Sequence, residues 1–179
     1  FGEAGDAGGQ IEAGLIALET LWSRGEIAEL IERAEALYER ARAIGDRVRE
    51  LQLCARLAPS YSVAFRPEGA AAYLRRTDEL VRELGARRPP WSRTAQCREV
   101  RNRGALSAAL ACYAEFPEIA RVEQDPQLRL AHLRNTSEIV VMERRRYVDG
   151  YEIAREGVEF SERLNETWNR KELTGMLAL

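Results

Sequence analysis

Residues 26–44 read EIAELIERAEALYERARAI, and this stretch decides the fold class. Its apolar side chains recur at alternating spacings of three and four residues, which lines them along one face of an α-helix. They are Ile27, Leu30, Ile31, Ala34, Leu37, Tyr38, Ala41 and Ile44. Gly45-Asp46 follows, and a glycine just past the last apolar residue is typical of a helix C-terminus. The stretch therefore predicts an amphipathic helix that ends before Gly45.

A second helix is expected just before this one. Its apolar residues have the same helical spacing, and Gly25 closes the segment. They are Ile11, Leu15, Leu18, Leu21 and Trp22. Two helices joined by so short a turn form a helical hairpin. The glycine-rich residues 1–10 have no such pattern, and we expect a flexible leader or a cloning remnant there.

The hairpin recurs along the sequence with a period of 40 residues. Gly45-Asp46 has counterparts at Gly85-Ala86 and at Asn165-Glu166, and Ala34 in the second helix corresponds to Leu74, Tyr113 and Ala154. The period predicts units at residues 11–46, 47–86, 91–125 and 126–166, with a fifth begun at 167–179. We therefore predict an all-α fold over residues 11–179, a right-handed α-solenoid of about four antiparallel helical hairpins.

Residues 146–157, RYVDGYEIAREG, resemble the second helix of a tetratricopeptide repeat (TPR). That family has an aromatic residue, a small residue three positions later and another seven positions after that. Tyr147, Gly150 and Gly157 match this pattern, and the other units match it in part. Their residues are Ile27, Leu30 and Leu37, then Pro67, Ala70 and Thr77, then Leu106, Ala109 and Phe116. The longer period resembles the divergent repeats of LuxR-type ATP-dependent regulators and of some bacterial signalling enzymes.

Prolines and caps predict where the helices are interrupted. Pro59 lies inside an expected first helix, so we expect a kink or an early end there. Pro117 is expected to break the second helix of the third unit. Ser92 is a candidate N-cap after the loop at residues 87–91, and Asp125-Pro126 predicts a turn into the fourth unit.

Composition limits the classes of partner and compartment. The 179 residues are 45% hydrophobic and 31% charged with a net charge of −2, which predicts no global field toward nucleic acid or anionic membranes. No apolar run reaches the length of a membrane-spanning helix, so no membrane contact is expected.

Cys54, Cys97 and Cys112 are too few and too scattered for a disulfide framework or a zinc site. Reduced thiols and a cytoplasmic location are the prediction.

No sequence motif predicts catalysis. His132 is the single histidine, which excludes two-histidine zinc motifs and leaves a serine or cysteine nucleophile no other imidazole base. No glycine-rich phosphate loop follows a strand pattern. We expect no catalytic residue, no metal and no cofactor, and we expect that the protein is not an enzyme.

The middle of the sequence is basic. From Arg87 to Arg146 there are twelve arginines and seven acidic residues, a net charge of +5. A solvated face and an anion site are both open interpretations. In TPR proteins the first helix of each hairpin lines a groove. The resemblance implies groove positions at Thr94, Arg98, Arg101, Asn102, His132, Asn135 and Glu143.

Arginine forks and asparagine amides suit an acidic peptide or a C-terminal carboxylate, which is the partner we predict for this groove. Nucleic acid is a weaker candidate, because the basic stretch carries few aromatic residues. The terminal Leu173, Met176, Leu177 and Leu179 predict an unfinished hairpin that either continues in a longer protein or forms a homodimer.

The protein is thus predicted to be a protein-binding or peptide-binding scaffold. It would form the regulatory or sensory segment of a larger bacterial signalling or transcription-regulating protein. The alternative is a small-molecule-sensing or dimerisation module of a multidomain enzyme such as a nucleotide cyclase. An apolar groove lined by Trp22, Trp91 or Tyr61 would favour that alternative.

Overall fold

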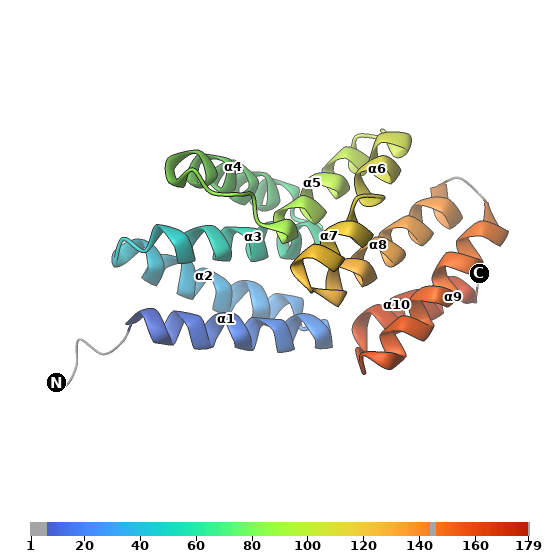
Figure 1. Cartoon of the computed structure of the whole chain (residues 1–179), viewed down its shortest axis with the longest axis horizontal. Helices are drawn as coiled ribbons and strands as arrows, with labels where there is room; N and C mark the ends of the chain where they lie inside the picture. The colour runs from blue at the N-terminus through green and yellow to red at the C-terminus, as the bar shows by residue number, and fades with distance from the viewer. Residues whose placement is uncertain (1–6, 144–145, 179) are drawn as a thin grey trace. The chain divides into compact units, whose positions relative to one another are not determined.

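The computed structural model describes residues 7–143 and 146–178, and every regular element in these ranges is helical (Figure 1). The elements are α1 (Ala7–Arg24), α2 (Ile27–Ala43), α3 (Arg47–Val63), α4 (Pro67–Leu84), α5 (Pro90–Asn102), α6 (Leu106–Tyr113), α7 (Phe116–Glu123), α8 (Pro126–Glu138), a π-helical segment η1 (Ile139–Glu143), α9 (Tyr147–Arg163) and α10 (Trp168–Leu177). The predicted all-α class is therefore correct.

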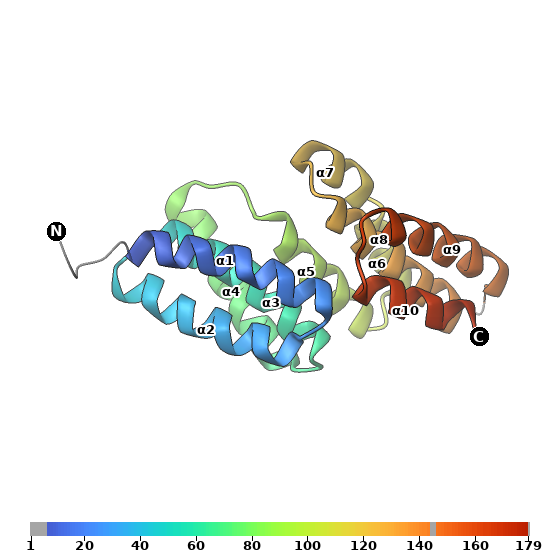
Figure 2. The ribbon, with the colours of Figure 1, turned by 90° about the horizontal axis from the view of Figure 1, so that it is seen from below.

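The protein forms two compact units, Phe1–Gln96 and Cys97–Leu179, which we call the N-terminal and the C-terminal unit. In the N-terminal unit, α1 to α4 pack each on the next and lie side by side in Figure 1, whereas α3 and α4 lie partly behind α1 and α2 in Figure 2. In the C-terminal unit, α8 packs against α7 and α9, and α10 packs against α9 and α8. Sequential neighbours in contact are the arrangement that helical hairpins produce.

Left-handed residues end the helices at regular intervals. The described residues with positive φ are Gly25, Gly45, Phe65, Gly85, Gly104, Gln124 and Asn165, which follow one another at intervals of 19, 20 or 41 residues. The amide after each of them donates to a carbonyl five residues earlier, as Asp46 N does to Ala41 O at 2.9 Å. This bond closes the last helical turn in the Schellman motif. Gly45, Gly85 and Asn165, which the sequence pattern made equivalent, thus each follow a helix end with positive φ.

The core of the N-terminal unit is built around α3. Leu53, Cys54, Leu57 and Ala58 are fully buried, so this helix is covered on most of its circumference. Apolar side chains of α4 and α5 complete two clusters against it, Leu51 with Cys54 and Leu80, and Ala58 with Leu74 and Ala95. The residues predicted to be equivalent to Ala34 are all buried, which agrees with the helical register derived from the sequence.

Two glycines allow close helix packing in the C-terminal unit. A Cβ atom on Gly150 would lie 2.1 Å from Val141 Cγ2, and one on Gly157 would lie 2.7 Å from Leu173 Cδ1. Only a residue without a side chain fits at such distances. The small residues predicted at these positions therefore have the expected role, whereas the aromatic residue of the pattern, Tyr147, is exposed.

The interruptions differ from the prediction in two places. Pro59 does not end α3, which continues to Val63, so the expected early end is wrong. Ser92 is not an N-cap, because α5 begins at Pro90 and the Ser92 hydroxyl donates to Pro89 O at 2.8 Å. Pro117 does mark a break, since α6 ends before it and α7 begins at Phe116. The side chain of Asp125 caps α8 through Gln127 N.

The cysteines also differ from the prediction. Cys97 of α5 and Cys112 of α6 form a disulfide with 5.6 Å between their Cα atoms, so the expectation of three reduced thiols is wrong. Sequence spacing alone could not reveal it, because two helices first have to pair to bring these side chains together. The cytoplasmic location inferred from reduced thiols loses that support, since disulfides are most common in oxidising compartments.

The C-terminal hairpin is more complete than predicted. Leu173 is fully buried against Gly157 of α9, and the Ser137 hydroxyl donates to Met176 Sδ at 3.0 Å. Leu177 is half-buried, and Leu179 lies outside the described residues. The expectation that this apolar face has no partner within the protein is therefore wrong for Leu173.

No described helix combines the length and the apolar character that crossing a membrane would require.

Candidate functional site

Two arginines of the predicted groove bridge α5 to α8. Arg98 Nη2 donates to Asn135 Oδ1 at 3.0 Å, and Arg101 Nη2 lies 2.8 Å from Glu138 Oε1. Positions three apart on a helix share a face, so the two bridges run in parallel. The structure therefore brings Arg98, Arg101 and Asn135 together and adds Glu138, which the repeat pattern did not reveal.

Glu138 lies among three guanidinium groups. Its burial alone would raise the pKa of the carboxyl, but the hydrogen bond from Arg101 and the charges of Arg101, Arg98 and Arg134 lower it. Glu138 is thus ionised at neutral pH, and the positive charges of three guanidinium groups act on its carboxylate.

Arg134 is the most buried of these arginines. It donates to Asn169 Oδ1 at 3.0 Å, and its guanidinium carbon lies 4.4 Å from the centroid of the Trp168 ring. Burial, followed by the charge of Arg98, lowers the pKa of Arg134 to about 10, so it remains charged at neutral pH. A buried charge of this kind is costly unless it is compensated by partners or by a ligand.

Asn135 differs from its predicted role. It is buried, its Nδ2 donates to Ala131 O at 2.6 Å and its Oδ1 accepts from Arg98. Both groups of the amide are therefore bound within the unit. The expectation that this amide grips an extended peptide is wrong, and Asn135 instead orients the Arg98 guanidinium.

Two of the other predicted groove residues, His132 and Thr94, contact backbone carbonyls. His132 Nδ1 lies 2.7 Å from the carbonyl oxygen of Tyr113, and burial lowers the pKa of His132, so a neutral ring that donates from Nδ1 fits best. Thr94 Oγ1 donates to a carbonyl of its own helix at 2.7 Å. Asn102 is exposed at the end of α5, and the side chain of Glu143 lies outside the described residues.

The N-terminal unit has a cleft of about 260 Å³ between α1, α3 and the start of α5. Its apolar lining comes from Leu15, Ile16, Ala55, Pro89 and Trp91. Its polar lining comes from Glu12, Glu19, Gln52 and Arg56. Of the three aromatic residues considered from the sequence, Trp91 lines the cleft. The Trp22 ring packs edge-on against the Trp91 ring, with 5.5 Å between their centroids.

Ion pairs connect the two helices that form this cleft. Arg56 of α3 pairs with Glu19 of α1, and its guanidinium carbon lies 4.8 Å from the centroid of the Trp91 ring. Seven residues earlier on each helix, Arg49 Nε lies 3.4 Å from Glu12 Oε2. The Arg56–Glu19 bridge spans 37 residues of sequence, and so do both bridges between α5 and α8. No sequence signal indicated the cleft, because these bridges depend on how the helices pack.

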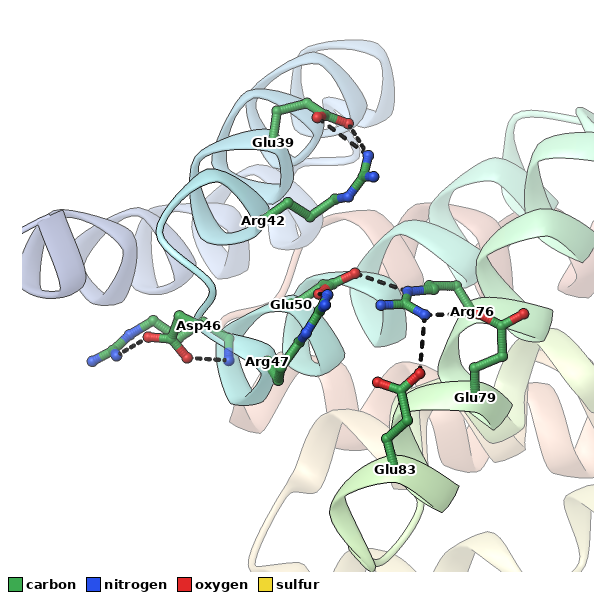
Figure 3. A network of polar contacts seen from close by, with 9 residues as sticks. Glu39, Arg42, Asp46, Arg47, Glu50, Arg76, Glu79 and Glu83 are labelled. Carbon is green, nitrogen blue, oxygen red and sulfur yellow. Dashed lines mark hydrogen bonds and ion pairs between the residues drawn. The ribbon is translucent and has the colours of Figure 1, made fainter.

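A separate charge network joins α3 to α4 (Figure 3). The buried carboxylate of Glu50 lies 2.7 Å from Arg47 Nη1 and 2.8 Å from Arg76 Nε, and Arg76 also contacts Glu79 and Glu83. Burial alone would raise the pKa of Glu50, but the hydrogen bonds from Arg76 and Arg47 lower it. The network therefore acts as a charged clamp between two helices.

This network does not activate the nearby thiol. Burial, together with the charge of Glu50, raises the pKa of Cys54 to about 12. A thiol with so high a pKa is protonated at neutral pH and is a poor nucleophile. Across the described ranges, no group of three or more His, Cys, Asp and Glu side chains is arranged to hold a metal ion.

Comparison with known proteins does not assign this sequence to a family. No protein-family model matches the sequence, and no curated protein matches it. The resemblance to tetratricopeptide repeats therefore stays a prediction from the pattern of residues 146–157 and the period of the turns.

Proposed function

We propose that this protein is a non-catalytic, TPR-like scaffold that binds a carboxylate-bearing peptide segment, either acidic or with a free C-terminus. It would serve as the regulatory or sensory part of a larger bacterial signalling or transcription-regulating protein. Two observations support a right-handed α-solenoid as its architecture. Helix-ending residues recur at nearly constant intervals, and arginine bridges recur between first helices at a separation of 37 residues.

The observation that carries the ligand class is the gathering of Arg98, Arg101 and Arg134 around Glu138. A guanidinium has five N–H groups, so a carboxylate supplied by a partner can add to the contacts that these arginines already make within the unit. Because the Arg101 side chain is only 15% exposed, water screens the site weakly and an ion pair there is stronger than one at an open surface.

The geometry of the arginines suits this ligand. A guanidinium carries five N–H groups in one plane, so it can bind Glu138 or Asn135 on one edge and a ligand carboxylate on another. Arg98 and Arg101 project from the same face of α5 and are held by their bridges to α8. Such fixed donors lose little conformational entropy when a ligand binds.

The test measures calorimetric binding of the whole protein to matched peptides with either a free or an amidated C-terminus, and to acidic peptides. Arg98→Gln and Arg101→Gln remove the proposed contacts. Arg103→Gln is the matched control, because Arg103 lies on the exposed part of the same segment and pairs locally with Glu99.

We expect the carboxylate peptides to bind and each of the two site variants to weaken binding by roughly tenfold or more, as for a buried charge contact. The control should retain the wild-type affinity. Absence of binding by every carboxylate peptide, or equal losses in Arg103→Gln and Arg98→Gln, would refute the proposal.

A second candidate is a small-molecule-sensing or dimerisation module of a multidomain enzyme. The cleft beside Trp91 favours it, because a concave site with an apolar lining and a few convergent polar groups is the usual form of a ligand site. Its volume of about 260 Å³ lies just below the roughly 300–1,000 Å³ of typical small-molecule sites. The size is better suited to a single large side chain, which favours dimerisation over sensing.

A further inference from the structure

Phe65 is an unusual residue for its position. It forms the turn between α3 and α4 with φ of 57°, in the left-handed region where Gly25, Gly45 and Gly85 serve the equivalent turns. A side chain there costs conformational energy that glycine avoids. Phe65 is also 88% exposed, more than any other large apolar residue among the described ones. Folding of this unit therefore gains little from the presence of Phe65.

The cleft beside Trp91 offers a site for such a ring. Its walls are the apolar side chains of Ile16, Ala55 and Trp91, and Ile16 is itself 68% exposed. Trp91 is 6% exposed and Ala55 2%, so a ring in the cleft would bury mainly Ile16 and the accessible part of Trp91. An exposed aromatic residue and a cleft of about 260 Å³ thus lie in the same unit.

The charges around the two surfaces are complementary. At the cleft, the carboxylates of Glu12 and Glu19 are more exposed than the arginines that pair with them, so a ligand meets an acidic rim. Arg66 follows Phe65 directly and is exposed. A ring entering the cleft would bring this guanidinium toward the rim.

We propose that a second copy of this protein occupies the cleft, by inserting Phe65 beside Trp91 with Arg66 at the acidic rim. The contact is head-to-tail, because each copy offers the Phe65 turn to one neighbour and the cleft to another. A contact centred on one side chain is small and makes the association weak and concentration-dependent. The proposal uses the N-terminal unit alone and does not depend on the carboxylate site.

The test measures the mass of the whole protein by sedimentation equilibrium up to about 1 mM, the range in which a weak contact is populated. Phe65→Gly removes the inserted ring and relieves the strained turn, so it should abolish association while raising Tm. Ile16→Arg occludes the cleft and repels Arg66, and it should also yield a monomer. Arg66→Glu should weaken association, whereas Glu68→Gln, which removes an acidic neighbour of Arg66, should strengthen it.

Mixing two variants makes the test decisive. Phe65→Gly retains an intact cleft and Ile16→Arg retains an intact Phe65, so the mixture should form a one-to-one complex although neither variant associates alone. Val148→Ser, which removes another exposed apolar side chain far along the sequence, is the control and should associate like the wild type. A wild type that stays monomeric at about 1 mM, or a Phe65→Gly variant that still associates, would overturn the proposal.

Discussion

The buried carboxylate of Glu50 allows the sharpest stability prediction. Its side chain is fully buried between Arg47 and Arg76, and replacement by glutamine removes the negative charge while it keeps the shape. Removing one partner of a buried ion pair typically costs about 3–5 kcal/mol, because the remaining charge is left uncompensated. Here Arg47 is half exposed and Arg76 keeps Glu79 and Glu83. We therefore expect Glu50→Gln to lower the free energy of unfolding by about 2–3 kcal/mol.

Glu39 provides the matched control, because it lies in the same region (Figure 3) but pairs with Arg42 at the surface. The side chains of Arg42 and Glu39 are 51% and 66% exposed, so Glu39→Gln should cost about 0–0.5 kcal/mol. Urea unfolding at pH 7, followed by circular dichroism, measures the change in the free energy of unfolding for both variants. Equal midpoints for the two variants would refute the assignment of a clamp to Glu50.

The pH dependence of the same comparison supplies a second check. The pKa of Glu50 is lower in the folded protein than in the unfolded protein, where it is near 4.3. The stabilisation is therefore complete above that unfolded value and is lost as the pH falls through the folded value. The difference between wild type and Glu50→Gln should shrink below about pH 5. A difference that stays constant down to pH 3 would contradict an ionised Glu50 in the clamp.

Packing in the C-terminal unit supports three further predictions. Gly150→Ala would press a methyl group into a neighbouring valine at 2.1 Å and should destabilise by about 1–3 kcal/mol, whereas Gly175→Ala meets no atom and should stabilise by about 1 kcal/mol. Thermal unfolding compares the two, and equal effects would contradict the close packing. Reduction of Cys97–Cys112, which are 15 residues apart, should cost about 3 kcal/mol in urea unfolding with and without reductant. Burial lowers the pKa of His132, so the unfolded protein takes up a proton first and stability should fall below about pH 6.5. His132→Gln should flatten that fall, and parallel pH profiles would argue against a buried neutral imidazole.

Much of the secondary structure is predictable because its causes are local. The apolar spacing in residues 26–44 predicts an amphipathic helix, and α2 spans Ile27–Ala43. The turns at Gly45, Gly85 and Asn165 are found where the repeat predicts them, because a helix end needs a residue that tolerates positive φ. Phe65 carries no such signal, so the turn there could not be recognised from its residue type.

The partners of polar side chains were much harder to predict. The groove positions of Arg98 and Arg101 are on the expected helix, but their binding to Asn135 and Glu138 depends on how α5 packs against α8. Composition indicated a basic segment without showing that a carboxylate would be shared among its arginines. The same limit explains why the prediction left Asn135 available to a ligand.

The sequence by itself determined the helices, their turns and the close-packing glycines of this protein, because these depend on residues within a turn or two of one another. Tertiary structure alone decided the disulfide Cys97–Cys112, the burial of Leu173, the Glu50 clamp and the cleft beside Trp91. Each of these joins different helices, and the rotation and spacing of packed helices are set by many side chains together. Burial and charge pairing follow from that packing, and so does the candidate chemistry of both surfaces.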